Sequence, residues 1–256
     1  MTALFAGAAR RNLIELRRYA FDTVFSLGGV LLLFLLLFYG ARGLGGPNLS
    51  NGQTLTSLVA GFITFGVVIQ SYSAIAGWMT QEATLGTLEQ LAMSPYGLLR
   101  VLLAEFVASF GYQLIVVLAM STVVQAATGR WLHLDLVAIA PVLVVLLLQV
   151  LGCGLLLGGL ALVFKRVTAL VNLMQFGFVA LIAAPVHTYA WMKWMPVALA
   201  SDVLRQITVS RAQLADISAG TWLLLLAVTS ICLAAGVVVF RQMEDLARDR
   251  GLIGVH

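Results

Sequence analysis

Long runs of apolar residues without any charge are the strongest constraint in this sequence. From position 23 to position 41, between Asp22 and Arg42, no Asp, Glu, Lys or Arg occurs. An α-helix rises about 1.5 Å per residue, so about 20 consecutive apolar residues cross the roughly 30 Å hydrocarbon core of a bilayer. Further runs of similar length follow along the chain. We therefore expect an integral membrane protein built from membrane-spanning helices.

The composition excludes a water-soluble fold. Of the 256 residues, 61% are hydrophobic and only 10% are charged, whereas roughly a quarter of the residues of a soluble domain are charged. The formal net charge of +4 could suggest a nucleic-acid partner, but the basic residues stand at the edges of the apolar runs, as in the loops of membrane proteins. We interpret the charge as a sign of topology and expect no nucleic-acid partner.

The apolar runs predict an all-α integral membrane fold with six transmembrane helices in a single domain, residues 1–256. The expected spans cover residues 23–41, 55–79, 98–128, 136–164, 167–185 and 221–240. Ahead of them, residues 3–20 segregate apolar side chains from arginines, which predicts an amphipathic helix in the membrane interface; a cytoplasmic extension of the first span is the alternative. Charges interrupt residues 186–217, so this segment predicts short helices at the outer interface, where tryptophan is favoured.

The positions of Lys and Arg orient these spans, because the cytoplasmic loops of membrane proteins carry an excess of basic residues. Ten of the 15 basic residues fall on the side that holds both termini, namely Arg10, Arg11, Arg17, Arg18, Arg100, Lys165, Arg166, Arg241, Arg248 and Arg250. The other five fall on the opposite side, namely Arg42, Arg130, Lys193, Arg205 and Arg211. This excess predicts that both termini are cytoplasmic and that the protein is a multi-pass protein of the plasma (inner) membrane.

The connection between the second and third expected spans is short and polar, and it contains its own helix signals. Gly86 can end the preceding long helix, and Thr87 with Gln90 forms a capping-box pattern. Pro95 disfavours helix at the residue before it. These signals predict a separate short helix in the cytoplasm from Thr87 to Met93.

The apolar residues of this short helix leave two interpretations open. Leu88, Leu91 and Ala92 form one apolar face, and such a face can dock into a groove of another protein. Capping boxes are common, however, and by periodicity alone an ordinary capped turn is the simpler explanation.

The same connection resembles the cytoplasmic motif of ABC-2 type transporter permeases, in which a glutamate precedes Gly-Thr-Leu-Glu and a Ser-Pro pair ends the segment. The matching residues are Glu82, Gly86, Thr87, Leu88, Glu89, Gln90, Leu91, Ser94 and Pro95. The resemblance extends over nearly the whole chain, from the basic interfacial helix through six spans to a re-entrant outer segment between the fifth and sixth. Pro196, Asp202 and Arg205 also resemble the Pro, acidic and Arg pattern of that outer segment.

The resemblance implies the transmembrane subunit of an ATP-driven ABC exporter. In such families a short coupling helix fits a cleft on a separate ATPase (nucleotide-binding) subunit and transmits its closure to the spans. The residues expected to contact the ATPase are Glu82, Thr87, Leu88, Glu89, Gln90 and Leu91. Because six spans form half of the usual pathway, the resemblance also implies a second permease subunit, either an identical copy or a paralogue, in addition to contact with membrane lipid.

The motifs of an enzyme are missing from the sequence. No Gly-x-x-x-x-Gly-Lys-Ser/Thr run occurs, so we expect ATP and Mg²⁺ to bind the partner ATPase and no cofactor to bind this chain. The histidines at 133, 187 and 256 are widely separated, and no metal site is expected. A standalone secondary carrier or channel is the alternative class, although such carriers usually place ionisable groups near the middle of the membrane, where this chain has almost none.

Uncharged polar residues within the expected spans are candidates for a substrate path: Gln70, Ser71, Tyr72, Ser73, Gln113, Gln149, Asn172 and Gln175. Each could instead form a hydrogen bond between helices, which is at least as common for a single polar residue in a bundle. Since the spans lack charge, we expect an amphiphilic, drug-like or lipid-like cargo; a polysaccharide or glycolipid is the alternative.

Two further groups of residues are expected to be structural. Gly152, Gly154, Gly158 and Gly159 would allow close packing of helices. The aromatic residues Tyr189, Trp191 and Trp194 could contact a sugar or a lipid headgroup, but anchoring at the membrane interface explains them with fewer assumptions.

Overall fold

The structure, a computed structural model, describes residues 28–40 without 30, 33 and 37, and residues 52–85, 98–129, 136–164, 168–184, 186–210 and 212–249. The expected interfacial helix at 3–20 lies outside these ranges. Within them the chain is helical and contains no strand, as the sequence predicts. The helices are α4 (Gly52–Leu85), α6 (Leu98–Thr128), α7 (Leu136–Val163), α8 (Thr168–Ile182), η1 (Ala190–Trp194), α9 (Ala198–Ser210), η2 (Leu214–Asp216) and α10 (Ala219–Asp249); the described residues between 28 and 40 are also helical.

Three of these helices contain stretches long and apolar enough to cross a membrane: Leu55–Met79 in α4, Val137–Val163 in α7 and all of α10. They correspond to the second, fourth and sixth expected spans, and they identify the chain as a membrane protein. Helix α10 continues nine residues beyond the expected end at position 240, to Asp249. The residues of α10 beyond position 240 are mostly polar or charged. An ion pair between side chains one turn apart, Arg248 Nη2 to Glu244 Oε1 at 2.6 Å, stabilises this end of the helix.

The remaining expected spans are helical but are not established as crossings. Helix α6 has the bounds that the sequence predicts for the third span, and Gly129, at φ +66°, ends it with the left-handed conformation that glycine adopts most easily. Helix α8 is only 15 residues long, about 22 Å, and is therefore shorter than the predicted span at 167–185. Pro185 follows in the sequence and disfavours helix at the residue before it. The number of six spans stays a prediction.

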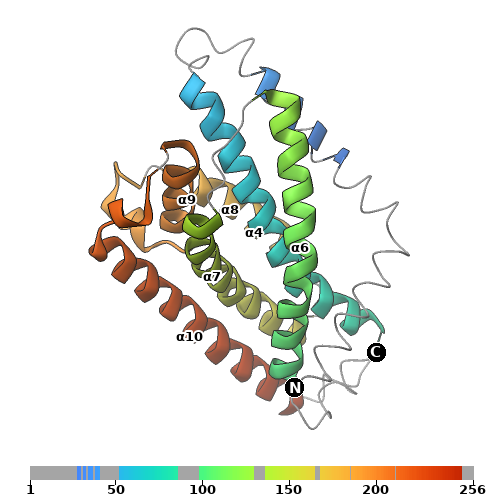
Figure 1. Ribbon diagram of the computed structural model, residues 1–256. Helices are drawn as coiled ribbons and strands as arrows, with labels where there is room; N and C mark the ends of the chain where they lie inside the picture. The colour runs from blue at the N-terminus through green and yellow to red at the C-terminus, as the bar shows by residue number, and fades with distance from the viewer. Residues whose placement is uncertain are drawn as a thin grey trace.

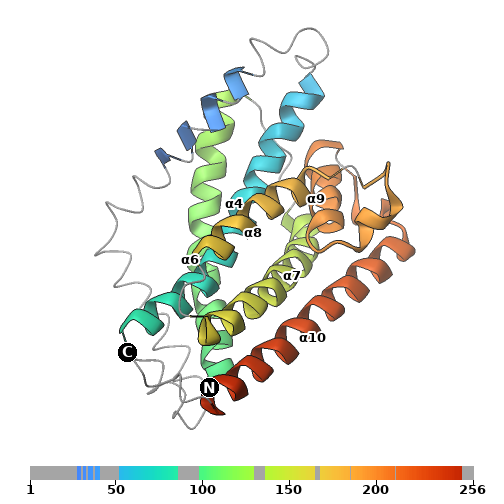
Figure 2. The same cartoon turned by 180° about the vertical axis from the view of Figure 1, so that it is seen from behind.

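The long helices α4, α7 and α10 run in the same direction along the bundle, and α6 runs in the opposite direction (Figure 1). Helix α7 packs against α10, α4 and α9. Helix α8 also packs against α4, on the side that faces the viewer in Figure 2. The helical residues near position 34 pack on the beginning of α4 and the end of α6 through Phe34, Leu55 and Val124. The Tyr39 hydroxyl also donates to the carbonyl oxygen of Ala127 at 2.7 Å.

One end of the bundle is held together by a cluster of buried apolar residues from four helices. The end of α4 contributes Trp78 and Met79, the beginning of α6 contributes Leu98 and Leu102, the end of α7 contributes Leu155 and Leu162, and the end of α10 contributes Phe240 and Ala247. The last turns of α4 and the first turns of α6 therefore lie at the same end of the bundle. We call it the α4-exit end.

Glycines bring α7 and α10 into direct backbone contact. A Cβ atom added at Gly236 would lie 2.5 Å from the carbonyl oxygen of Gly152, and one added at Gly152 would lie 2.6 Å from that of Cys232. A Cβ atom added at Gly159 would likewise lie 3.0 Å from the Cα atom of Phe240. The prediction that the glycines of this span serve helix packing is confirmed at these positions, because any larger residue would push the two helices apart.

Candidate functional site

The expected coupling region begins on a continuous helix. Helix α4 extends beyond its apolar stretch, which ends at Met79, and continues through Glu82 to Leu85. The sequence predicts the break at the next residue, Gly86. The other expected contact residues, Thr87, Leu88, Glu89, Gln90 and Leu91, lie outside the described residues. The structure thus describes the two helices that this connection joins and none of the residues from 86 to 97 between them.

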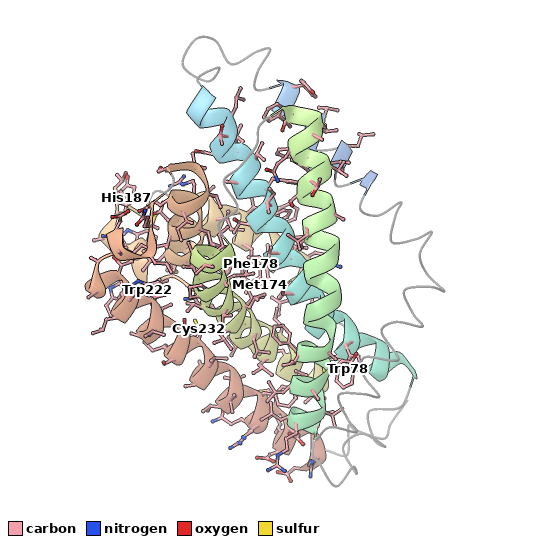
Figure 3. All side chains as sticks on the ribbon, in the orientation of Figure 1. Trp78, Met174, Phe178, His187, Trp222 and Cys232 are labelled. Atoms are coloured by element: carbon pink, nitrogen blue, oxygen red, sulfur yellow. The ribbon has the colours of Figure 1, made fainter. Side chains whose placement is uncertain are left out.

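Among the candidate path residues, Tyr72 serves the packing of helices. Its side chain is fully buried, and its hydroxyl donates to the carbonyl oxygen of Val171 on α8 at 3.2 Å. Its ring meets that of Phe178 edge to face, with the ring centroids 5.2 Å apart (Phe178 is labelled in Figure 3). Ser71 is also buried, and Gln70 is half-buried. These contacts of Tyr72 are those that the alternative interpretation, a hydrogen bond between helices, predicts.

Gln149 connects three parts of the fold inside the bundle. Its side-chain amide donates from Nε2 to Thr229 Oγ1 on α10 at 3.1 Å. Its oxygen Oε1 accepts from the backbone N–H of Val197, just before α9, at 2.7 Å. All three residues are buried. Both ends of the Gln149 amide are used by the protein itself, so its role in this structure is to tie α7 to α10 and to the segment before α9.

The other candidate path residues do not join a common site among the described side chains. Asn172 is exposed on α8 beside the exposed apolar residues Leu173 and Phe176, and Gln175 is half-buried. Ser73 and Gln113 lie within α4 and α6, but their side chains are outside the described part. The polar residues of the expected spans are thus distributed over separate contacts.

Val197 is the one non-glycine residue with a positive φ angle in the described part of the chain. Its φ angle is +70°, and it has a positive φ although it is β-branched, a conformation that costs roughly 1–2 kcal/mol for an L-residue. The N–H of Ala198 donates to the carbonyl oxygen of Pro196 at 2.8 Å, which closes a tight three-residue turn around Val197. The Val197 carbonyl then accepts the first hydrogen bond of α9, from Ser201 N at 2.8 Å. This turn sets the direction in which α9 leaves.

A buried carboxylate at the beginning of α9 gathers three donors. Asp202 is only 3% exposed, and it is paired with Arg205 and with His187, whose Nε2 lies 2.9 Å from Oδ2. Gln206 Nε2 donates to the same oxygen at 2.9 Å. The side chains of His187 and Arg205 stay largely open to the outside, at 69% and 41% exposed. The buried charge is therefore compensated inside the segment, as burial of a carboxylate requires.

The sequence pointed to Asp202 and Arg205 only through their resemblance to the outer segment of the family, and it pointed to neither Gln206 nor His187. Asp202, Arg205 and Gln206 are three and four residues apart, a spacing that places them on one face of a helix. His187 carried no such signal, since it lies before η1 and reaches Asp202 only through the fold. Figure 3 shows His187 at the end of the bundle opposite to Trp78, and hence opposite to the α4-exit end.

The described residues offer no other chemistry that would define a site. No group of three or more His, Cys, Asp or Glu side chains that could hold a metal ion occurs among them. Cys153 is buried, Cys232 is half-buried, and both are free thiols. Comparison of the chain with models of known protein families finds no matching family, and comparison with curated proteins finds no match.

Proposed function

We propose that this chain is the transmembrane permease subunit of an ATP-driven exporter of the ABC-2 type. The observation that supports the proposal is where the two helices that flank the motif lie. Met79, six residues before the end of α4, and Leu98, the first residue of α6, belong to one apolar cluster, so the motif residues connect two helices whose facing ends lie at the same end of the bundle. A segment held at both ends in this way can transmit a push from a partner to both helices.

The partner in this proposal is a separate ATPase subunit. The chain has no phosphate-binding loop of its own, so ATP and Mg²⁺ would bind that subunit. Glu82, on the polar end of α4, and Thr87 to Leu91, in the connection, would form the contact. The amphipathic pattern of Leu88 and Leu91 suits a groove, and the acidic Glu89 would stand at its rim.

The assembly in this proposal contains two permease subunits and two ATPases, in the plasma membrane, with both termini of each permease in the cytoplasm. An amphiphilic, drug-like or lipid-like molecule is the proposed cargo. The described interior supports an uncharged path, because the buried polar residues of the long helices, such as Gln149 and Thr229, carry no charge. An ion or a strongly charged sugar would lack compensating groups there.

Co-purification of proteins with this chain from its native membrane tests the proposal. We expect a stable complex whose ATPase activity depends on the permease, and we expect Leu88→Asp combined with Glu89→Arg to abolish that dependence. A control, Ser210→Asp combined with Ala215→Arg, introduces the same two residue types at exposed positions near the opposite end. The proposal is wrong if ATPase activity survives the first pair of substitutions in a folded complex, or if no ATPase co-purifies.

A further inference from the structure

The short helix η1 presents its aromatic residues to the outside. No residue of η1 is buried, and Trp191 and Trp194 are 57% and 60% exposed. Tyr189, directly before η1, is 51% exposed. Indole and phenol rings combine an apolar body with one polar atom, so exposure of three of them over six residues is unfavourable in water and favourable where water meets hydrocarbon. We call Tyr189, Trp191, Lys193 and Trp194 the aromatic edge.

The position of η1 along the bundle matches such a boundary. Helix η1 contacts α10, and α10 begins with a polar cap in which Ser218 Oγ accepts from the N–H of Thr221 at 3.2 Å. One turn further, an exposed apolar stripe begins on α10 with Leu223, Leu226 and Ile231. On a helix apolar enough to span a membrane this stripe has the surface that lipid chains cover. Helix η1, which carries three of the four residues of the aromatic edge, thus contacts the helix that bears this stripe.

The charges around the aromatic edge favour phosphate. The segment from 186 to 210 contains Lys193 and Arg205 as permanent cations and Asp202 as its one acidic residue. The carboxylate of Asp202 is buried and paired with Arg205, whereas 41% of the Arg205 side chain is exposed. The outward field of the segment is therefore positive, and lysine or arginine beside tryptophan is the pairing that binds the phosphates of a membrane surface.

We propose that the aromatic edge binds the phospholipid headgroup layer, with the two indole rings at the level of the ester groups and Lys193 at the phosphates. A protein partner fits poorly, because a stable interface covers about 800 Å² on each side and η1 has only five residues. The lipid contact holds the segment before α9 at a fixed depth. Its depth in turn determines where the turn at Val197 and the Asp202 cluster lie relative to the membrane surface. This proposal rests on the membrane-spanning helices and not on the exporter function.

Fluorescence quenching by lipids labelled at different depths tests the proposal. A variant with Trp78→Phe, Trp131→Phe, Trp194→Phe and Trp222→Phe keeps Trp191 as its one tryptophan, and the equivalent variant keeps Trp194. In phospholipid vesicles we expect loss of emission to be largest with a quencher near the ester groups and smaller with one near the chain ends. A control variant keeps Trp78, which is 8% exposed at the opposite end of the bundle, and we expect weaker quenching at every depth.

Each other result overturns the proposal. Loss of emission with aqueous iodide but not with labelled lipid would place the edge in water. Quenching that is strongest near the chain ends would place it in the hydrocarbon, and quenching by neither would show that protein covers it. If a four-fold variant fails to fold, Trp191→Phe with Trp194→Phe in the otherwise intact chain replaces it, and the fraction of emission quenched near the ester groups should fall. Lys193→Glu should reduce quenching by a labelled anionic lipid more than by a labelled neutral lipid; equal quenching would exclude the phosphate contact.

Discussion

The side chain of Gln149, in the middle of α7, accepts a hydrogen bond from the backbone N–H of Val197, the strained residue before α9, at 2.7 Å. The same side chain donates to Thr229 on α10. One buried amide thus holds a backbone conformation that Val197 would not adopt alone. The packing of the segment between α8 and α10 onto the bundle depends on this connection.

Gln149→Leu should lower the stability of the protein, because it leaves the buried N–H of Val197 without an acceptor. The loss of such a bond costs about 1–3 kcal/mol. The measurement is the midpoint of thermal unfolding in detergent or nanodiscs. Gln242→Leu, at an exposed position of α10, is the control and should change the midpoint little. Equal midpoints for Gln149→Leu and the wild type would show that the connection carries no stability.

At Val197 the Gly variant should be more stable than the Ala variant, whereas at a valine within a helix the Ala variant should be the more stable. At Val197 the positive φ favours Gly over Ala by roughly 1–2 kcal/mol, so Val197→Gly should unfold at a higher temperature than Val197→Ala. At Val203, buried within α9, the Ala variant should be more stable to unfolding than the Gly variant by about 1 kcal/mol. Comparing the two pairs removes the loss of side-chain packing, which is similar at both sites. The same order at both positions would contradict the strained turn.

The contact between α7 and α10 predicts a contrast between two glycine substitutions. Gly236→Ala places a methyl group 2.5 Å from a backbone oxygen, and overpacking of this kind typically costs about 1–3 kcal/mol. Gly177→Ala in α8 meets no atom within 4 Å and should be neutral or stabilising by up to about 1 kcal/mol. Thermal unfolding of both variants measures the difference. A tolerated Gly236→Ala would mean that the helices are further apart than described.

Cysteine labelling tests the orientation. In a chain with Cys153→Ala and Cys232→Ala, single cysteines replace Asn51, Ser94 or Ser210. In intact cells an impermeant maleimide should label Asn51→Cys and Ser210→Cys but not Ser94→Cys, and in inside-out vesicles the pattern should reverse. The physical reason is the excess of Lys and Arg on the side of Ser94. Labelling of Ser94→Cys from the outside would overturn the orientation.

The helix bounds that the sequence predicts well are those with a local signal. Helix α6 ends where Gly129 stands, because glycine reaches a positive φ without strain. The span predicted at 221–240 lies within α10, and the helix continues to Asp249, because hydropathy reports where a helix leaves the membrane and not where it stops. Helix α8 is shorter than predicted, and Pro185 was the signal that could have shown it.

The partners of the polar residues could not be predicted in the same way. Gln149 and Tyr72 are candidates because they are polar residues within expected spans. The partners of Gln149 are Val197 and Thr229, and the partner of Tyr72 is Val171, and these lie between 48 and 99 positions away in the sequence. Only the fold brings these groups together. For the same reason His187 was not recognised as a partner of Asp202, whereas Arg205 lies on the same helix face.

Photo-crosslinking from the motif segment tests the exporter proposal most directly. A benzoylphenylalanine introduced at Leu91 should form, on illumination of native membranes, an adduct with a protein that contains a Gly-x-x-x-x-Gly-Lys-Ser/Thr loop, identified by mass spectrometry. The same group at Ser210, which is exposed at the end of α9, should form none. An adduct at Leu91 that ATP analogues strengthen is the result that we expect. Absence of an ATPase adduct at Leu91, or an equal yield at Ser210, would contradict the proposal.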